Sequence, residues 1–292
     1  MDEIGLIGVG EAGAMFMDSL LDAGYAVTCY DRGHQIDYAR DQGATVVPTQ
    51  ADVAERTDAI VIAVTGTAHL ESVMEGDDGL LTVADPGQLI LNTSTVTVSA
   101  SQKYQRHCTD AGIHWVSAPW TSNAPAGGLI MLPGGDDASI DAATDLIAAC
   151  STQHLRFDDV ERAMVFKYLM QIRYAARVAI DAEIVEVANA ADVDAQPLNT
   201  VLGMDLDESL FTGEYTQDGE GLSALDSWDK DLGYAVEYSH GTGAAKDGIA
   251  MPLTSMVHEI YKHGNRVAGA DERHAAAVAR YWQALNRDVS GD

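Results

Sequence analysis

Cysteine is scarce in this chain of 292 residues, and its few thiols lie far apart. Cys29, Cys108 and Cys150 form an odd set without a C-x-x-C pair, so they predict neither a disulfide framework nor a zinc site. Cys29 lies in an apolar, strand-like run, where a buried and inert thiol is typical. Unpaired thiols of this kind indicate a reducing compartment, so we expect a cytoplasmic protein.

Long apolar runs and metal-binding motifs are also missing. No apolar run reaches the roughly 18 residues that span a membrane. The chain starts with the acidic residues Asp2 and Glu3, whereas a secretory signal starts with basic residues and an apolar stretch, so we expect none. His258-Glu259 begins like the H-E-x-x-H zinc motif, but Lys262 stands where the second histidine should fall, and we expect no metal.

Basic residues are few: 17 Lys and Arg stand against 45 Asp and Glu, which gives a formal charge of −28. The acidic residues are spread along the chain, and such a surface repels nucleic acids and anionic membranes, which we therefore exclude as partners. The composition resembles that of halophilic, particularly haloarchaeal, proteins, whose self-repulsion is screened because the Debye length in molar salt is about 3 Å. An ordinary acidic protein is the alternative that the composition leaves open.

The residues that are present predict a folded protein with two domains. Apolar residues make up 47% of the sequence, which is enough for a core, and a chain of this length usually divides in two. Up to about residue 157, apolar runs typical of strands alternate with helical patterns, which predicts a parallel sheet with helices on both faces. Strands are expected at 3–8, 26–30, 59–64 and 88–92, and a helix at 12–23 that Gly24 ends.

The second part of the chain shows helical patterns alone. The helix expected at 161–191 is apolar on almost every side in its first half, so it should be buried. No strand pattern follows it. The sequence therefore predicts an α/β domain at 1–157 and an all-helical domain at 158–292.

A glycine-rich turn joins the first predicted strand to the first predicted helix. Its residues, Gly8, Val9, Gly10, Glu11, Ala12 and Gly13, match G-x-G-x-x-G. In this pattern Gly8 permits the tight turn, Gly10 lets the backbone approach a pyrophosphate, and Gly13 lets the helix pack on the strand. Free amides and the helix dipole favour the phosphate charge. The first domain is therefore predicted to be a Rossmann-type domain that binds a dinucleotide.

An acidic residue follows the second predicted strand. Asp31 lies 21 residues after Gly10, where the dinucleotide motif places the carboxylate that accepts hydrogen bonds from the adenosine ribose. This favours NAD, whereas the neighbouring Arg32 could pair with a 2′-phosphate and leaves NADP open, unless Arg32 is merely a surface residue. Val64 and Thr65, at the end of the strand 59–64, are also expected to contact the cofactor.

The segment 8–24, GVGEAGAMFMDSLLDAG, resembles the opening of the β-hydroxyacid dehydrogenases. That family includes 3-hydroxyisobutyrate dehydrogenase, tartronate semialdehyde reductase and, more distantly, 6-phosphogluconate dehydrogenase. Further segments resemble family motifs in the family's order, namely Asn92-Thr93-Ser94-Thr95, Ala118-Pro119 through Gly134-Gly135, Lys167, and Lys230-Asp231-Leu232. Together they cover nearly the whole chain.

The resemblance implies that Lys167 is the catalytic lysine. An ammonium near a carbonyl that receives a hydride stabilises and protonates the oxygen, and partial burial lowers the pKa of a lysine, which gives it both roles near neutral pH. The family usually has Asn four residues later, where this chain has Gln171. Gln171 lies on the same helix face and could bind substrate or orient Lys167. The alternatives are a lysine at the helix edge and a glutamine that only caps the core.

The loop after Ala118-Pro119 departs from the family pattern and is about three residues shorter. Its candidate substrate-binding residues are Trp120, Thr121, Ser122 and Asn123. Their hydroxyl and amide groups could bind a carboxylate, and the run faintly resembles the loop of sulfolactaldehyde reductases, which bind a sulfonate. An ordinary polar turn would have the same composition.

Three further residues take roles from the resemblance. Ser94 should contact the substrate and Thr95 the cofactor, although either residue is also a natural N-cap for the next helix. Lys230 should close over the cofactor, unless it is a solvated lysine between two aspartates.

The sequence thus predicts an NAD(P)-dependent oxidoreductase of small 3-hydroxyacids or their semialdehydes, similar to 3-hydroxyisobutyrate or glycerate. A sulfonate such as sulfolactaldehyde or dihydroxypropanesulfonate is a further candidate. An imine reductase-like enzyme is less favoured, because such enzymes commonly lack the lysine, and a non-catalytic dinucleotide-binding protein would not need one. Family members form dimers and tetramers, so we expect a homodimer or homotetramer.

The acidic composition generates the first testable prediction. The midpoint of thermal unfolding should be well above its dilute-buffer value in molar KCl, because salt screens the repulsion between like charges. Scanning calorimetry in the two buffers measures this difference. Equal midpoints would exclude salt adaptation and leave an ordinary acidic protein.

Overall fold

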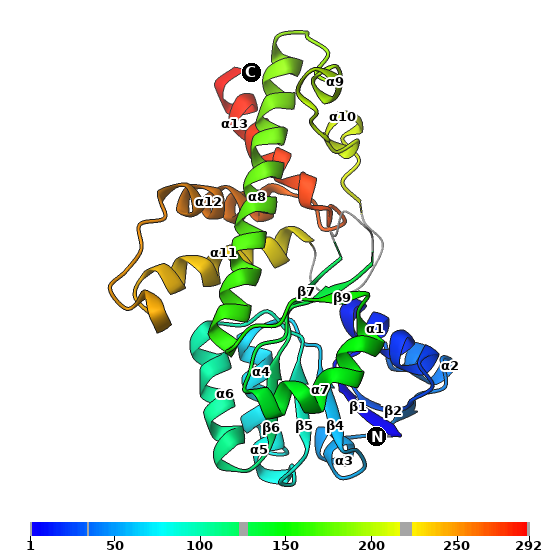
Figure 1. Ribbon diagram of the computed structural model, residues 1–292. Helices are drawn as coiled ribbons and strands as arrows, with labels where there is room; N and C mark the ends of the chain where they lie inside the picture. The colour runs from blue at the N-terminus through cyan, green and yellow to red at the C-terminus, as the bar shows by residue number, and fades with distance from the viewer. Residues whose placement is uncertain (1, 34, 123–127, 217–223, 291–292) are drawn as a thin grey trace. The chain divides into compact units, whose positions relative to one another are not determined.

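The computed structural model describes residues 2–33, 35–122, 128–216 and 224–290 (Figure 1). Internal contacts divide the chain into two units, Met1–Lys167 and Tyr168–Asp292. The division falls inside the helix α8, Val160–Ala190, so one helix supplies residues to both units.

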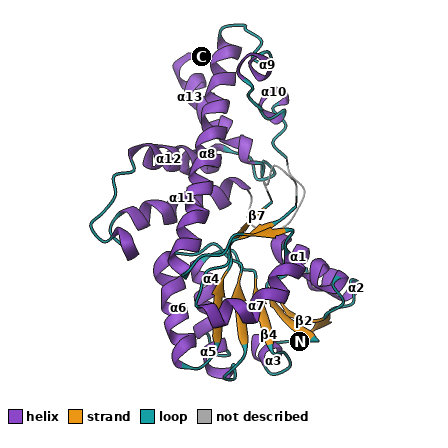
Figure 2. Cartoon of the chain, viewed as in Figure 1, coloured by secondary structure: helices purple, strands orange, loops and turns teal. Residues whose placement is uncertain are grey.

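The first unit is built on a parallel sheet, whose strands are orange in Figure 2. The strand order is β3-β2-β1-β4-β5-β6. The strands are β1 (Glu3–Ile7), β2 (Ala26–Tyr30), β3 (Thr45–Val46), β4 (Ala59–Ile62), β5 (Leu89–Asn92) and β6 (His114–Ser117). Every paired neighbour is parallel, and β1, β4 and β5 are almost wholly buried, as a sheet covered on both faces requires. The expected Rossmann-type domain followed by a helical part is confirmed.

Helices connect these strands and bury the sheet. They are α1 (Glu11–Asp22), α2 (Ile36–Asp41), α3 (Gln50–Ala54), α4 (Thr67–Glu75), α5 (Leu80–Val83), α6 (Val98–Asp110) and α7 (Asp137–Cys150). The chain runs outward from β1 to β3 and then returns to β4 on the other side of β1. In such a sheet ligands bind beyond the carboxyl ends of the strands where the direction changes. The segments that follow β1 and β4 are therefore where the site should lie.

A small second sheet was not expected from the sequence. The strands β7 (Trp120–Thr121), β8 (Ile130–Met131) and β9 (Gln153–His154) pair in that order, antiparallel and then parallel. Strands of two residues are too short to show an alternating pattern, which is why no pattern in the sequence indicated them. The consequence is that the start of the predicted substrate loop is held as a strand.

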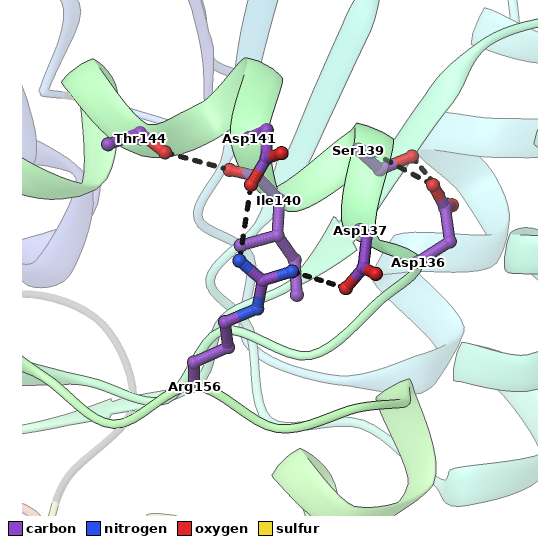
Figure 3. A network of polar contacts seen from close by, with 7 residues as sticks. All are labelled: Asp136, Asp137, Ser139, Ile140, Asp141, Thr144 and Arg156. Carbon is purple, nitrogen blue, oxygen red and sulfur yellow. Dashed lines mark hydrogen bonds and ion pairs between the residues drawn. The ribbon is translucent and has the colours of Figure 1, made fainter.

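Polar contacts attach the chain after β9 to the start of α7 (Figure 3). Asp136 caps α7, since its carboxylate accepts hydrogen bonds from the backbone N–H of Ser139 at 2.9 Å and from its hydroxyl at 2.7 Å. Arg156 donates to Asp137 at 2.5 Å and to Asp141 at 3.1 Å. The ion pairs are exposed and worth little, whereas the cap is worth about 1 kcal/mol.

Among the described residues of the second unit, all the regular secondary structure is helical. After α8 come α9 (Leu198–Leu202), α10 (Ser209–Thr212), α11 (Ala224–Ser239), α12 (Pro252–Val267) and α13 (Ala279–Ser290), with short 3-10 turns at 243–245 and 275–278. The core contains small residues of α8, among them Ala175, Ala179 and Ala182, packed with Leu232 and Tyr261. Within the described ranges, no helix is long and apolar enough to cross a lipid bilayer.

Candidate active site

The turn between β1 and α1 has glycine where close packing, or the close approach of a ligand, leaves no room for a side chain. Gly8 has φ of +94°, and a Cβ on it would collide with the carbonyl oxygen of Ala63. A Cβ on Gly13 would collide with the carbonyl oxygen of Gly8. A Cβ on Gly10, in contrast, would meet nothing within 4 Å. Protein packing therefore explains Gly8 and Gly13, while the open space at Gly10 fits the close approach of a ligand.

The first turn of α1 offers amides to that ligand. Gly10 is the N-cap residue and has no side chain to bond the free N–H groups of the first turn. Such amides and the helix dipole favour an anion, so the turn fits the pyrophosphate of a nicotinamide dinucleotide. The acidic side chain of Glu11 is exposed, and Ala12 packs at the edge of the core.

Asp31 braces this turn, a contact that the sequence did not indicate. Its carboxylate accepts hydrogen bonds from the backbone N–H of Val9 at 2.6 Å and of Gly33 at 2.5 Å. An ionised carboxylate accepts about four hydrogen bonds, so ribose hydroxyls can still bind. Arg32 is exposed.

The thiol of Cys29 lies near Asp31. Burial is the main cause that raises the pKa of this thiol, to about 11, and the negative charge of Asp31 is the second. Cys29 is therefore neutral, as an inert thiol should be.

The ends of β4 and β5 are joined by a side chain. The hydroxyl of Ser94 accepts a hydrogen bond from the backbone N–H of Val64 at 2.9 Å. Asn92 holds the main chain of Ser94 in turn, because its side-chain oxygen accepts from the N–H of Ser94 at 3.2 Å. The structure thus brings together two predicted site residues from different strands.

The capping alternative for Ser94 and Thr95 does not hold. The N-cap of α6 is Thr97, whose hydroxyl accepts from the N–H of Ala100 at 3.3 Å. Thr95 is partly buried, and Thr65, which is exposed, makes a 2.7 Å hydrogen bond with His69.

Lys167 is buried in α8, with only 8% of its surface exposed. Its Nζ donates a hydrogen bond to the backbone carbonyl oxygen of Trp120 at 2.7 Å, which ties the lysine to the start of the predicted substrate loop. The ring of Trp120 packs edge-on against Phe16 of α1, with 5.7 Å between centroids. Nearby along the loop, Thr121 is buried and Ser122 is exposed, while Asn123 lies outside the described residues.

Gln171 lies one helical turn after Lys167 and makes a buried hydrogen bond. Its Nε2 donates to a carboxylate oxygen of Asp231 in α11 at 2.6 Å, and the two residues are 5% and 2% exposed. Lys230 lies 3.1 Å from the other oxygen of Asp231. In the motif Lys230-Asp231-Leu232, the sequence predicted a role for Lys230 alone. Asp231, the buried partner of Gln171, had no role predicted from the sequence.

The second aspartate beside Lys230 faces another helix. Asp229 pairs with His258 of α12 at 3.1 Å and accepts a hydrogen bond from Asn265 at 3.2 Å. Lys230 itself has 22% of its side chain exposed and lies 5.7 Å from the centre of the Tyr234 ring. The two aspartates therefore hold α11 to α12 and to α8 at the turn that carries Lys230.

Comparison with known proteins gives the family. Residues 3–163 match the model of the NAD binding domain of 6-phosphogluconate dehydrogenase. The chain is similar to 2-(hydroxymethyl)glutarate dehydrogenase of Eubacterium barkeri, with 24% identity over 99% of this chain and 98% of that protein. It is also similar to L-threonate dehydrogenase of Cupriavidus necator, with 24% identity over 94% of each chain.

A solved structure shows the same fold over both units. The crystal structure of 3-hydroxyisobutyrate dehydrogenase from Salmonella typhimurium matches with a TM-score of 0.80 and 21% identity, covering 96% of this chain and 99% of that one. The family match agrees with the glycine turn after β1, with the reversal of strand order between β1 and β4, and with the buried lysine. The chain belongs to the β-hydroxyacid dehydrogenase family and is an oxidoreductase that uses a nicotinamide dinucleotide.

Proposed function

We propose that this enzyme interconverts a small 3-hydroxyacid and its semialdehyde, with a substrate similar to 3-hydroxyisobutyrate or glycerate. The observation that carries the proposal is the buried Lys167, hydrogen-bonded to the start of the predicted substrate loop. The names of the relatives, which include 3-hydroxyisobutyrate, L-threonate and L-serine dehydrogenases, support a small hydroxyacid. A sulfonate analogue remains a candidate substrate, and only the residues of the predicted substrate loop support it.

Lys167 is proposed to handle the proton of the reacting hydroxyl. When bound, the nicotinamide supplies or accepts the hydride on the reacting carbon. In the oxidation direction the neutral amine of Lys167 takes the hydroxyl proton as the carbon–oxygen double bond forms. In reduction the ammonium of Lys167 stabilises the developing alkoxide and returns the proton to it.

The other residues are proposed to hold the two ligands. Thr121, Ser122 and Asn123 would bind the substrate anion through hydroxyl and amide donors, with Trp120 narrowing the site. The cofactor would be held by the turn residues from Gly8 to Gly13 and by Asp31, Val64, Thr65, Thr95 and Lys230, while Ser94 and Gln171 would contact the substrate. These assignments combine the sequence motifs with the contacts described above.

The proposal predicts that Lys167→Ala lowers kcat by roughly 10² or more, because the alkoxide it stabilises exists only in the transition state. The dissociation constant of NAD, measured by fluorescence titration, should change little. Lys167→Met keeps the apolar stem and should be equally inactive, whereas Lys262→Ala, which removes a lysine paired with Glu259 on the surface, should be fully active. Near wild-type turnover in both Lys167 variants would make Lys167 structural.

Asp31 predicts a preference for NAD over NADP. Its carboxylate can accept hydrogen bonds from the ribose hydroxyls and repels a 2′-phosphate. The measurement is kcat/KM for each cofactor with one active substrate, and Arg32→Ala should leave the NAD value unchanged. A tenfold preference for NADP, about 1.4 kcal/mol, would show that Arg32 outweighs Asp31.

We also propose that the enzyme is a homodimer or homotetramer. Six apolar side chains on α8 and in the segment after it are half or more exposed, namely Leu169, Ile180, Val187, Val193, Val201 and Leu202. Apolar surface of this extent favours association. Sedimentation in molar KCl should give the mass of two or four chains, and Val187→Glu with Val201→Glu should reduce it. Leu155→Glu, an exposed apolar position in the first unit, is the control, and a monomeric wild type would refute the proposal.

A further inference from the structure

A pocket in the second unit lies on a side of α8 that the proposed reaction does not use. It has a volume of about 470 Å³ and lies between α8 and the chain that joins α9 to α10 (Figure 1). Successive residues of a helix are turned by about 100°, which places Arg173 and Arg177 about 160° and 120° around α8 from Gln171. Small-molecule sites measure roughly 300–1,000 Å³, so the pocket is large enough for a ligand of its own. Its lining includes Arg173, Arg177, Ile180, Asp181, Met204 and Asp205.

Arg177 brings a hydrogen-bond donor without an acceptor to this pocket. Its Nε is buried and makes no hydrogen bond among the described residues. A carboxylate oxygen of Asp181 lies 3.8 Å from this nitrogen, which is too far for a hydrogen bond. A buried donor without a partner is unfavourable, and a bound molecule that accepts the bond removes the cost.

The carboxylate of Asp181 is also incompletely compensated. Asp181 is buried, and burial raises the pKa of its carboxyl, while the positive charges of Arg177 and Arg173 act in the opposite direction. The negative charge of Asp205 adds to the rise. Because the pKa is raised in spite of two neighbouring arginines, a further positive charge close to Asp181 is favourable.

The charges of the pocket select the kind of ligand. A simple anion is attracted by the two arginines but repelled by the two aspartates, and a simple cation meets the reverse. In an α-amino acid, the carboxylate and the ammonium group are bonded to the same carbon. Such a molecule can replace the 3.8 Å contact between Arg177 and Asp181 by two charge-assisted hydrogen bonds. Ile180, which is half exposed, and Met204 offer apolar surface beside these charges.

We propose that this pocket binds a free α-amino acid with an apolar side chain. The carboxylate of the ligand accepts hydrogen bonds from Arg173 and Arg177, its ammonium group donates to Asp181, and its side chain packs on Ile180 and Met204. Ile180 also belongs to the apolar surface proposed for association, so the pocket borders that surface.

L-Leucine is the probe that tests the proposal. Titration calorimetry with the full chain, in molar KCl and at the lowest salt concentration at which the enzyme stays folded, should detect binding that is tighter at the lower salt. 4-Methylpentanoate lacks the ammonium group and leucinamide lacks the carboxylate. Each should bind at least about tenfold more weakly than leucine, because it leaves one charge of the pocket unpaired.

Substitutions separate the two charged contacts. Arg177→Met keeps much of the side-chain length but removes the guanidinium, and it should weaken the binding of leucine at least about tenfold. Asp181→Asn keeps the shape but removes the charge, so it should weaken the binding of leucine but not that of 4-methylpentanoate. Arg162→Met is the matched control and should bind leucine like the wild type, because Arg162 is an exposed arginine of the same helix that pairs with Asp158.

The outcomes distinguish this pocket from the active site. Lys167→Met should bind leucine as tightly as the wild type, and loss of binding would place leucine in the active site and overturn the proposal. Absence of binding in the wild type, or unchanged binding in Arg177→Met, overturns it as well. Equal affinity for leucine and 4-methylpentanoate overturns the contact with Asp181 and, with it, the assignment to an amino acid. The dissociation constant of NAD, unchanged in each variant, shows that the variants are folded, and the proposed dehydrogenase function depends on none of these results.

Discussion

The hydrogen bond between the ammonium of Lys167 and the carbonyl oxygen of Trp120 is the constraint on which the candidate site depends. A lysine that is 8% exposed needs a partner for its donors, and a main-chain carbonyl provides one without adding a second charge. The same bond fixes the start of the substrate loop, because Trp120 also begins β7 and packs against Phe16 of α1. The helix of the lysine, the loop and the helix of the glycine turn are thus joined by two contacts.

Two aspartates orient neighbouring polar groups: Asp31, which is partly buried, and Asp231, which is buried. Asp31 bonds the amide of Val9 and so shapes the turn that should receive the pyrophosphate, while Asp231 bonds Gln171 and lies beside Lys230. In each case the carboxylate fixes the direction of a neighbouring polar group. Hydrogen bonds to a charged group are roughly twice as strong as neutral ones, which suits them to this orienting role.

The sequence predicted those features that repeat along the chain or depend on neighbouring residues. The strands alternate with helices, the glycine turn lies between two of them, and the long helix expected at 161–191 is found at Val160–Ala190. The contacts that it did not predict join residues far apart in the sequence. Lys167 and Trp120 are separated by 47 positions, and Gln171 and Asp231 by 60. Contacts between residues so far apart produce no periodic pattern in the sequence. The cap of α6 shows the same limit locally, since Ser94, Thr95 and Thr97 are all natural caps and only geometry selects Thr97.

The distribution of lysine connects the surface with the site. The chain has five lysines, and two of them, Lys167 and Lys230, belong to the proposed machinery. A protein whose acidic surface is screened by salt needs few basic residues. A basic residue that serves only as a positive charge can equally be arginine. Arginine cannot replace Lys167, because a group that both gives and takes a proton near neutral pH must be able to lose it, and a guanidinium does not. A buried lysine in a chain with only five lysines is therefore consistent with the proton transfer proposed for Lys167. The main-chain carbonyl of Trp120 suits that role too, because it can remain beside the nitrogen whether the amine is charged or neutral.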